Sequence, residues 1–202
     1  AESHTRSVAG SDQVFDAACR KAGLHRADTL HELYDFSKAL ALLPRPRGSR
    51  LLVVTSSGGS GILATDAAQR SGLRVDPLPA EAAQHLRQGL PSQCVIGNPL
   101  DLTGDTDAER YYRAVTLAME HDLADLVLLV FGDPIPGAAE VAAQLKDKTG
   151  LPVAACYLGG GEDEGPETLA LHRAGIPVYV TPERAARALA ARAGLTWHRS
   201  TG

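Results

Sequence analysis

The stretch that decides the fold runs from Leu51 to Gly61 and has the sequence LLVVTSSGGSG. Its first four residues, Leu51 to Val54, form a short and continuous apolar run, which is typical of a strand buried on both faces of a parallel sheet. A glycine-rich turn follows, and the residues from Ser60 to about Ser71 have the spacing of a helix. The stretch therefore predicts a strand, a turn and a helix, the repeating unit of α/β folds.

The same alternation continues to the carboxyl end of the chain. Further strands are predicted at Leu73–Val75, Leu126–Phe131, Val153–Tyr157 and Val178–Val180, whereas residues 98–102 are predicted to form a loop. Further helices are predicted over residues 81–88, 107–120, 138–146, 168–174 and 182–193. Five strands joined by right-handed helical crossovers predict an α/β fold with a flavodoxin-like, doubly wound parallel sheet.

Two helices are predicted before the sheet, one from Ser11 to Gly23 and one from about Asp28 to Leu43. Pro44 and Pro46 then interrupt the helical pattern, so this segment is a linker. We therefore divide the chain into an arm with two helices (1–43), the linker (44–49), the flavodoxin-like domain (50–197) and a tail (198–202). The chain does not begin with Met, and we expect it to be part of a larger protein.

The composition narrows the possible functions. The 202 residues carry a formal net charge of −4 and contain no apolar run that could span a bilayer, so neither nucleic acid nor a membrane is an expected partner. Cys19, Cys94 and Cys156 form no Cys-x-x-Cys pair, and no two histidines have a spacing typical of metal ligands. We predict a cytoplasmic protein with no metal site in these residues.

The glycine-rich turn is the first candidate binding site. Its candidate phosphate-binding residues are Ser57, Gly58, Gly59, Ser60 and Gly61. Open parallel sheets bind ligands at the carboxyl ends of their strands, where the first amides of the next helix can hold an anion. Two alternatives stay open: a plain tight turn, or a dinucleotide site, because residues 59–64 fit a loose form of that motif and Asp76 follows.

His4 is the candidate catalytic residue. It lies in a short stretch of small and polar residues, Ser3-His4-Thr5, close to Ala9 and Gly10. A neutral imidazole nitrogen is a good nucleophile at pH 7, and it can accept a phosphoryl group and later release it. A loop of small residues would let the histidine move between two sites.

Several motifs, taken in order along nearly the whole chain, resemble those of the ADP-forming acetyl-CoA synthetases. They are Ser3-His4-Thr5 with residues 9–18, then residues 28–33, 52–66, 97–105 and 175–179. The resemblance indicates part of a nucleoside-diphosphate-forming acyl-CoA synthetase, an acid–thiol ligase related to succinyl-CoA synthetase. It covers the phosphohistidine loop and the flavodoxin-like ligase-CoA domain.

The resemblance implies a reversible reaction in which acyl-CoA, ADP and phosphate become carboxylic acid, CoA and ATP. An acyl phosphate forms first, and His4 then carries the phosphoryl group to ADP in an ATP-grasp domain. Ser57 to Gly61 matches one of two helix amino-termini that hold the phosphate. Coenzyme A, ATP or ADP, phosphate and Mg²⁺ are the implied cofactors, with a CoA-binding domain and an ATP-grasp domain as partners. Because these sites lie mostly outside the 202 residues, the chain alone is not expected to catalyse the full reaction.

Arg6 departs from the family pattern, which usually has glycine after Ser-His-Thr. Arginine makes the loop less flexible, although its cation can hold a phosphate. The departure keeps an alternative function open beside the synthetase, a non-catalytic regulatory domain like the synthetase-like region of some protein acetyltransferases. A dinucleotide-binding domain is the third interpretation, and it predicts affinity for NAD(H) rather than for phosphate.

Overall fold

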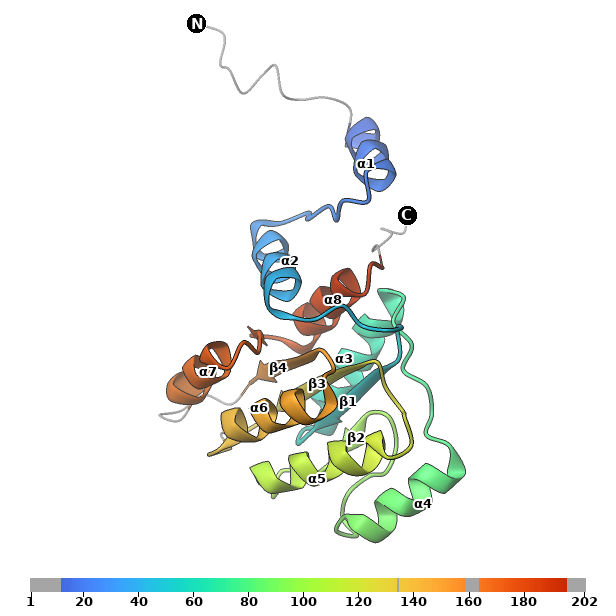
Figure 1. Ribbon diagram of the computed structural model, residues 1–202, viewed down its shortest axis with the longest axis vertical. Coiled ribbons are helices and arrows are strands. Elements are labelled where there is room, and N and C mark those ends of the chain that lie inside the picture. Colours follow the sequence, from blue (N-terminus) through green and yellow to red (C-terminus); the bar gives the residue numbers. More distant parts are fainter. Residues whose placement is uncertain (1–11, 134, 159–163, 196–202) are drawn as a thin grey trace, which may run out of the picture.

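The computed structural model describes residues 12–133, 135–158 and 164–195, which form helices around a parallel sheet (Figure 1). The helices are α1 (Asp12–Lys21), α2 (Leu30–Leu42), α3 (Gly58–Arg70), α4 (Ala80–Gly89), α5 (Ala108–Met119), α6 (Ala138–Thr149), α7 (Glu164–Arg173) and α8 (Pro182–Arg192). The strands are β1 (Leu51–Thr55), β2 (Leu100–Asp101), β3 (Leu126–Phe131), β4 (Val153–Tyr157) and β5 (Val178–Tyr179).

The five strands lie in the order β2-β1-β3-β4-β5, and every neighbouring pair is parallel. This is the strand order of flavodoxin-like folds. β2 lies next to β1 on one side, and the chain then returns past β1 to form β3 on its other side. The direction in which strands are added therefore reverses between β1 and β3. The predicted flavodoxin-like sheet is confirmed, and its ligand-binding crevice is expected at the carboxyl ends of these two central strands.

Helices cover both faces of the sheet because its central strands are apolar on both sides. Side chains alternate along β1, so Leu51 and Val53 pack with α3 and α8, whereas Leu52 and Val54 pack with α4, α5 and α6. All five residues of β1 and all six of β3 are buried. Figure 1 shows the resulting three layers, with α5 and α6 on one side of the sheet and α3 and α8 on the other.

The predicted strand at Leu73–Val75 is wrong. Arg74 forms only an isolated bridge with Arg50, with hydrogen bonds from Leu51 N to Arg74 O (2.7 Å) and from Arg74 N to Ser49 O (2.9 Å). Beyond it the chain leaves the sheet toward Pro77, which has no amide hydrogen for a further ladder bond.

The edge position belongs instead to β2, although residues 98–102 were predicted as a loop. Val54 pairs with Leu100, and Leu102 N donates to Thr55 O at 2.8 Å. The Asn98 side chain extends this edge by accepting from Val53 N (3.1 Å) and donating to Leu51 O (2.8 Å). A side-chain amide thus satisfies the backbone of β1 where a regular neighbouring strand would otherwise do so.

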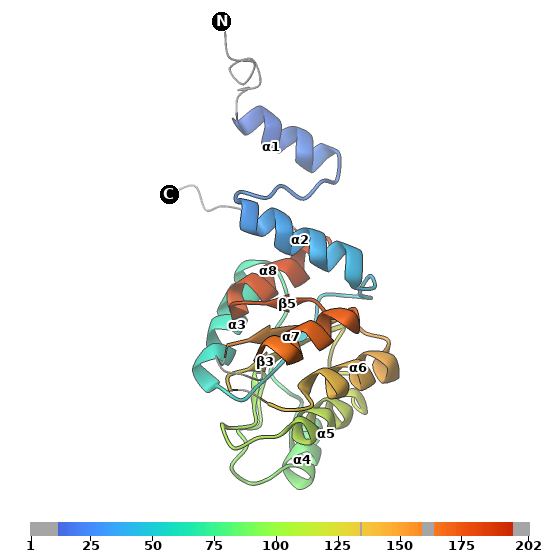
Figure 2. The same ribbon diagram turned by 90° about the vertical axis from the view of Figure 1, so that its left-hand side faces the viewer.

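The two helices before the sheet form an arm on the outside of α8. Figures 1 and 2 show α2 lying along α8, with α1 farther from the sheet. Thr29 caps α2 by accepting from Glu32 N at 3.1 Å, and Glu32 accepts in turn from Asp28 N at 2.8 Å, as in a capping box. The division of the chain at 44–49 stays a prediction.

In the part of the chain that the structure describes, every helix is too short or too polar to cross a lipid bilayer.

Candidate functional site

The predicted phosphate turn lies at the point where the strand order reverses. β1 ends at Thr55 and α3 begins at Gly58, so the residues between them lie at the carboxyl edge of the sheet beside the end of β3. Gly132, just after β3, donates from its amide to Ser56 Oγ at 2.8 Å. A Cβ on Gly132 would lie 2.7 Å from the Cβ of Ser57. The ends of the two central strands therefore approach each other closely where ligands of such sheets bind.

Hydroxyl groups hold the turn in shape. Thr55 Oγ1 accepts from Ser57 N and donates to Ser57 O, both at 2.9 Å. Ser57 is the N-cap of α3, yet its side chain makes no capping hydrogen bond and instead lies 3.0 Å from Ser60 Oγ. The first amides of a helix have no acceptor within the helix, so at α3 they point toward the open edge of the sheet.

Most other helix starts in the described residues differ from this one. Thr29, Asp107 and Thr181 cap α2, α5 and α8 with their side chains, and the Glu167 carboxylate accepts from two amides at the start of α6. Only α4, whose N-cap is Pro79, resembles α3 in lacking a side-chain cap among these helices. Because α3 starts at the carboxyl edge of the sheet, its amides and its dipole favour an anion there.

The three glycines of the turn have different surroundings. A Cβ on Gly58 would lie 2.7 Å from Asp101 Oδ2, and a Cβ on Gly61 would lie 2.9 Å from Thr55 Cγ2 and 3.1 Å from Pro99 Cβ. A Cβ on Gly59 would have no atom within 4 Å. Gly58 and Gly61 therefore allow the turn to pack closely on residues 99–101 and on the end of β1. Gly59 faces open space where a ligand can approach.

Asp101 is a neighbour of the turn whose place in the site sequence reasoning missed. It belongs to β2, and its Oδ1 accepts from Thr103 N at 2.9 Å. An anion at the turn would meet this carboxylate as well as the amides, and each dipole contribution is only about 0.3–1 kcal/mol at an exposed helix end. Several amide hydrogen bonds are therefore needed to hold phosphate beside Asp101. Asp101 lies in the predicted loop 98–102, and nothing in the sequence indicates that this segment pairs with β1.

The loop after β2 is held by its own polar side chains. Thr103 has a φ of 66°, which a β-branched residue rarely adopts. Hydrogen bonds from Thr103, Arg110 and Gln93 lower the pKa of Asp105, so this carboxylate stays ionised. Asp101 and Asp105 thus place negative charge at the carboxyl edge of the sheet. An anion can bind beside them if it is accompanied by a cation or accepts many hydrogen bonds.

His4, the candidate catalytic residue, lies outside the described residues, and so does Arg6. Its position relative to the glycine turn is therefore a prediction from the sequence. Within the described ranges, no group of three or more His, Cys, Asp and Glu side chains could hold a metal ion. His85 Nδ1 and His121 Nε2 lie 2.9 Å apart, a pair that their separation in the sequence did not predict.

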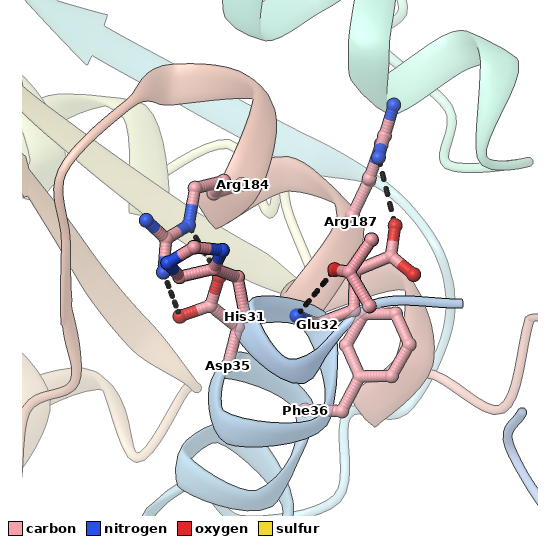
Figure 3. Close-up of a pocket in the computed structure, with 7 residues that line it drawn as sticks. His31, Glu32, Asp35, Phe36, Arg184 and Arg187 are labelled. Atoms are coloured by element: carbon pink, nitrogen blue, oxygen red, sulfur yellow. Dashed lines mark hydrogen bonds and ion pairs between the residues drawn. The ribbon is translucent and has the colours of Figure 1, made fainter. Parts of the chain in front are cut away.

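A cavity of about 180 Å³ lies between α2 and α8, away from the glycine turn (Figure 3). Its lining residues are Thr29, His31, Glu32, Asp35, Phe36, Arg184 and Arg187. Arg184 donates to Asp35 from Nε (2.6 Å) and Nη2 (3.0 Å), which raises the pKa of the guanidinium. Since Arg187 also pairs with Glu32 at 2.8 Å, the charges of this cavity serve the contact between the two helices.

Fold and turn together define a flavodoxin-like domain with an uncapped helix start at the carboxyl edge of its sheet. Residues 51–200 match the family model of the Ligase-CoA domain, and residues 1–40 match that of the succinyl-CoA ligase like flavodoxin domain. Because the first match covers most of the chain, the chain belongs to the Ligase-CoA domain family.

Curated relatives and solved structures agree with this assignment. The chain is 36% identical over 199 residues to the acetate–CoA ligase [ADP-forming] I subunit alpha of Pyrococcus furiosus, and the match covers 95% of this chain and 42% of that protein. It is 34% identical to acetate–CoA ligase [ADP-forming] I of Archaeoglobus fulgidus, covering 94% of the chain and 27% of the relative. The Ca. Korarchaeum cryptofilum dinucleotide forming acetyl-coenzyme A synthetase 1, in complex with phosphate and ADP, has a TM-score of 0.82 at 28% identity and covers 92% and 41% of the two chains. The chain spans less than half the length of these relatives.

Proposed function

We propose that this chain is part of an NDP-forming acyl-CoA synthetase that interconverts acyl-CoA, ADP and phosphate with a carboxylic acid, CoA and ATP. The observation that carries the proposal is the uncapped start of α3 at the carboxyl edge of the sheet, in a chain whose relatives are ADP-forming CoA ligases. A solved relative was obtained with phosphate and ADP. These findings support phosphate and a nucleoside diphosphate as ligands of the larger ligase.

The proposed reaction has the steps that the resemblance to ADP-forming synthetases implies. Phosphate attacks the thioester carbon of acyl-CoA, the carbon–sulfur bond breaks, and CoA and acyl phosphate form. A nitrogen of His4 then attacks the phosphorus, the carboxylate leaves, and ADP finally takes the phosphoryl group from the histidine to form ATP. The amides at Gly58, Gly59 and Ser60 would stabilise the charge on phosphate while His4 reacts.

The remaining ligands are proposed for other parts of the ligase. Coenzyme A would bind in a CoA-binding domain, and the nucleotide with Mg²⁺ would bind in an ATP-grasp domain, in the same protein or in a partner subunit. The turn fits phosphate because its residues are small and its helix start lacks a side-chain cap. The carboxylic acid that the ligase forms or consumes is small in this proposal.

Phosphohistidine formation in the larger ligase is the decisive experiment. The ligase is incubated with Mg²⁺ and ATP labelled in its γ-phosphate, and acid-labile label is expected on the chain. His4→Ala should abolish the label, because the imidazole is the phosphoryl carrier. Label that persists in His4→Ala would reject His4 as that carrier.

Arg6 favours a second candidate, the regulatory synthetase-like domain, since the family usually has glycine at this position. The two candidates differ in the same labelling experiment. If the ligase takes up no label until Arg6 is replaced by Gly, the domain is a synthetase that has lost phosphoryl transfer. Strong label with Arg6 present would reject this candidate.

Binding of inorganic phosphate to the 202-residue chain tests the turn by itself. Gly59→Asp adds a carboxylate to the first turn of α3 and is expected to weaken phosphate binding at least about tenfold, which corresponds to about 1.4 kcal/mol. Ala80→Asp is the matched control, because Ala80 is the exposed first residue of α4, whose N-cap Pro79 also makes no side-chain capping hydrogen bond. Phosphorus NMR titration measures both. Equal losses in the two variants would mean that phosphate binds elsewhere.

A further inference from the structure

Asp101 places a carboxylate directly beside the glycine turn. It is the last residue of β2, and its partner in the sheet is Thr55, the last residue of β1. A Cβ on Gly58, the first residue of α3, would lie 2.7 Å from Asp101 Oδ2. Because β1 leads into the turn and β2 is parallel to it, the sheet itself fixes this carboxylate next to the start of α3.

The two oxygens of this carboxylate have different surroundings. Oδ1 accepts from Thr103 N at 2.9 Å, which holds the side chain in one orientation. Oδ2, the oxygen beside Gly58, accepts no hydrogen bond from any residue in the described ranges. Since every buried polar side-chain atom in these ranges has a partner, and Asp101 is only half-buried, Oδ2 is open to solvent. A free acceptor therefore faces the place where the turn would hold an anion.

A carboxylate next to free amides discriminates between anions by the protons that they carry. The first amides of α3 donate to the oxygens of any tetrahedral anion, and the helix dipole attracts each of them. An ionised carboxylate only accepts, so it repels an anion without protons and binds one that can donate an O–H. Inorganic phosphate keeps at least one proton at neutral pH, whereas sulfate has nearly the same shape and keeps none. The two groups together therefore suit phosphate and disfavour sulfate.

Neighbouring carboxylates at the same edge are placed differently. Asp105 accepts hydrogen bonds from Gln93 and from side chains of its own loop and of α5. Asp133 follows β3 and is exposed, and its Oδ2 lies 3.8 Å from the position of a Cβ on Gly104 rather than near α3. Of these three carboxylates, Asp101 is the one whose free oxygen lies at the helix start.

We propose that Asp101 selects phosphate over other tetrahedral anions by accepting, through Oδ2, a hydrogen bond from a protonated phosphate oxygen. The amides of α3 hold the unprotonated oxygens of the same ion. The ligand class is a protonated oxyanion, which includes arsenate and excludes sulfate. The inference rests on the proposed function, since it takes the turn as the phosphate site, and it adds the group that makes this site selective.

Asp101→Asn changes the hydrogen-bonding character of one atom. The asparagine oxygen can still accept from Thr103 N, and this bond places the side-chain NH2 where Oδ2 stood. A donor then faces the anion, so sulfate gains a partner and loses a repelling charge. Phosphate loses the acceptor of its O–H but can turn an unprotonated oxygen to the new donor, so its affinity should change less.

Competition titrations of the 202-residue chain test the proposal. Phosphate binding is followed by phosphorus NMR, and arsenate and sulfate displace the phosphate at constant ionic strength. The native chain should bind phosphate and arsenate at least about tenfold more tightly than sulfate, as one charge-assisted hydrogen bond allows. In Asp101→Asn this ratio should fall to about threefold or less. Asp133→Asn is the matched control, because it removes a negative charge from the same edge and should shift all three affinities together.

The outcomes separate this inference from the proposed function. A native chain that binds sulfate as tightly as phosphate would overturn the inference, and this comparison needs no variant to fold. A ratio that is unchanged in Asp101→Asn, or lost equally in Asp133→Asn, would also overturn it. The phosphate turn itself would stand in these cases if Gly59→Asp still weakens phosphate binding. Binding of none of the three anions would reject the turn as a phosphate site, and the inference with it.

Discussion

At the scale of single residues, the turn after β1 shows that neighbouring glycines serve different purposes. Gly61 is buried where Thr55 and Pro99 approach the first turn of α3, whereas Gly59 is exposed. Close approach explains the first glycine, and the proposed phosphate site would explain the second. Substitution by alanine distinguishes these two roles, because the same methyl group is added to a crowded position at Gly61 and to an open one at Gly59.

Gly61→Ala is expected to lower the free energy of unfolding by about 1–3 kcal/mol, as other overpacked cores do. The added Cβ would lie 2.9 Å from Thr55 Cγ2, so the strand end or the helix must shift. Gly59→Ala should leave this free energy unchanged or raise it by up to about 1 kcal/mol, because alanine restricts the unfolded chain. Urea unfolding of both variants measures the difference, and equal destabilisation would contradict the packing argument.

Asp125 predicts how stability depends on pH. Arg50 donates to it from Nε (3.1 Å), Nη2 (3.0 Å) and its backbone amide (3.0 Å), and these bonds lower the pKa of the carboxyl. A lowered pKa in the folded state means that the stabilisation is complete above the ordinary pKa near 4 and is lost as pH falls through the folded value.

Asp125→Asn should therefore lower the free energy of unfolding by about 1–3 kcal/mol at pH 7. The difference from the native chain should shrink below about pH 4, where the native carboxyl also becomes protonated. Urea unfolding at pH 7, 5 and 3 measures the trend. A difference that is the same at all three values would show that Asp125 acts through something other than its charge.

At the scale of elements, the sequence predicts best those strands that are buried on both sides. β1, β3 and β4 are continuous apolar runs, so local composition is enough to find them. β2 has only two residues and follows Pro99. Its pairing is supported by the Asn98 side chain, which accepts from Val53, a residue 45 positions earlier in the sequence. The glycine turn was likewise predictable from its place after β1, whereas its neighbours Asp101 and Gly132 come from distant segments that only the strand order brings together.

One buried carboxylate contributes to the contact between α2 and α8. Asp35 is 2% exposed and accepts two hydrogen bonds from Arg184, with Lys38 Nζ at 3.6 Å. Asp35→Ala would leave both cations without this partner and is expected to weaken the docking of α2 by about 2 kcal/mol, less than for a fully buried pair because Arg184 is partly exposed.

Hydrogen exchange of α2 is the sensitive measurement for this variant, because the helix can open while the sheet stays folded. Amides of α2 should exchange faster in Asp35→Ala, and those of β3 should change little. Asp66→Ala, an exposed residue on α3, serves as the control and should change neither. Equal acceleration in β3 would mean that α2 and the sheet unfold together.

At the scale of the whole molecule, the chain consists of a flavodoxin-like domain and an arm that covers one of its helices. The covered helix, α8, is rich in alanine and packs against α2 on one side and α3 on another. Small side chains let these helices approach closely, but they bury little apolar surface each. The sheet and its helices therefore gain part of their stability from α2, which precedes them in the sequence.

Removal of residues 1–49 tests whether that linker is a domain boundary. The remaining chain keeps the whole sheet and both of its helical layers, so it should still unfold in one cooperative transition. It should melt about 10 °C lower than the full chain, because loss of Ala39 and Leu43 from the α8 contact removes about 3 kcal/mol of apolar burial. Differential scanning calorimetry measures both quantities. A shortened chain without a cooperative transition would place α2 inside the folding unit, and the boundary would then lie before α2 rather than after it.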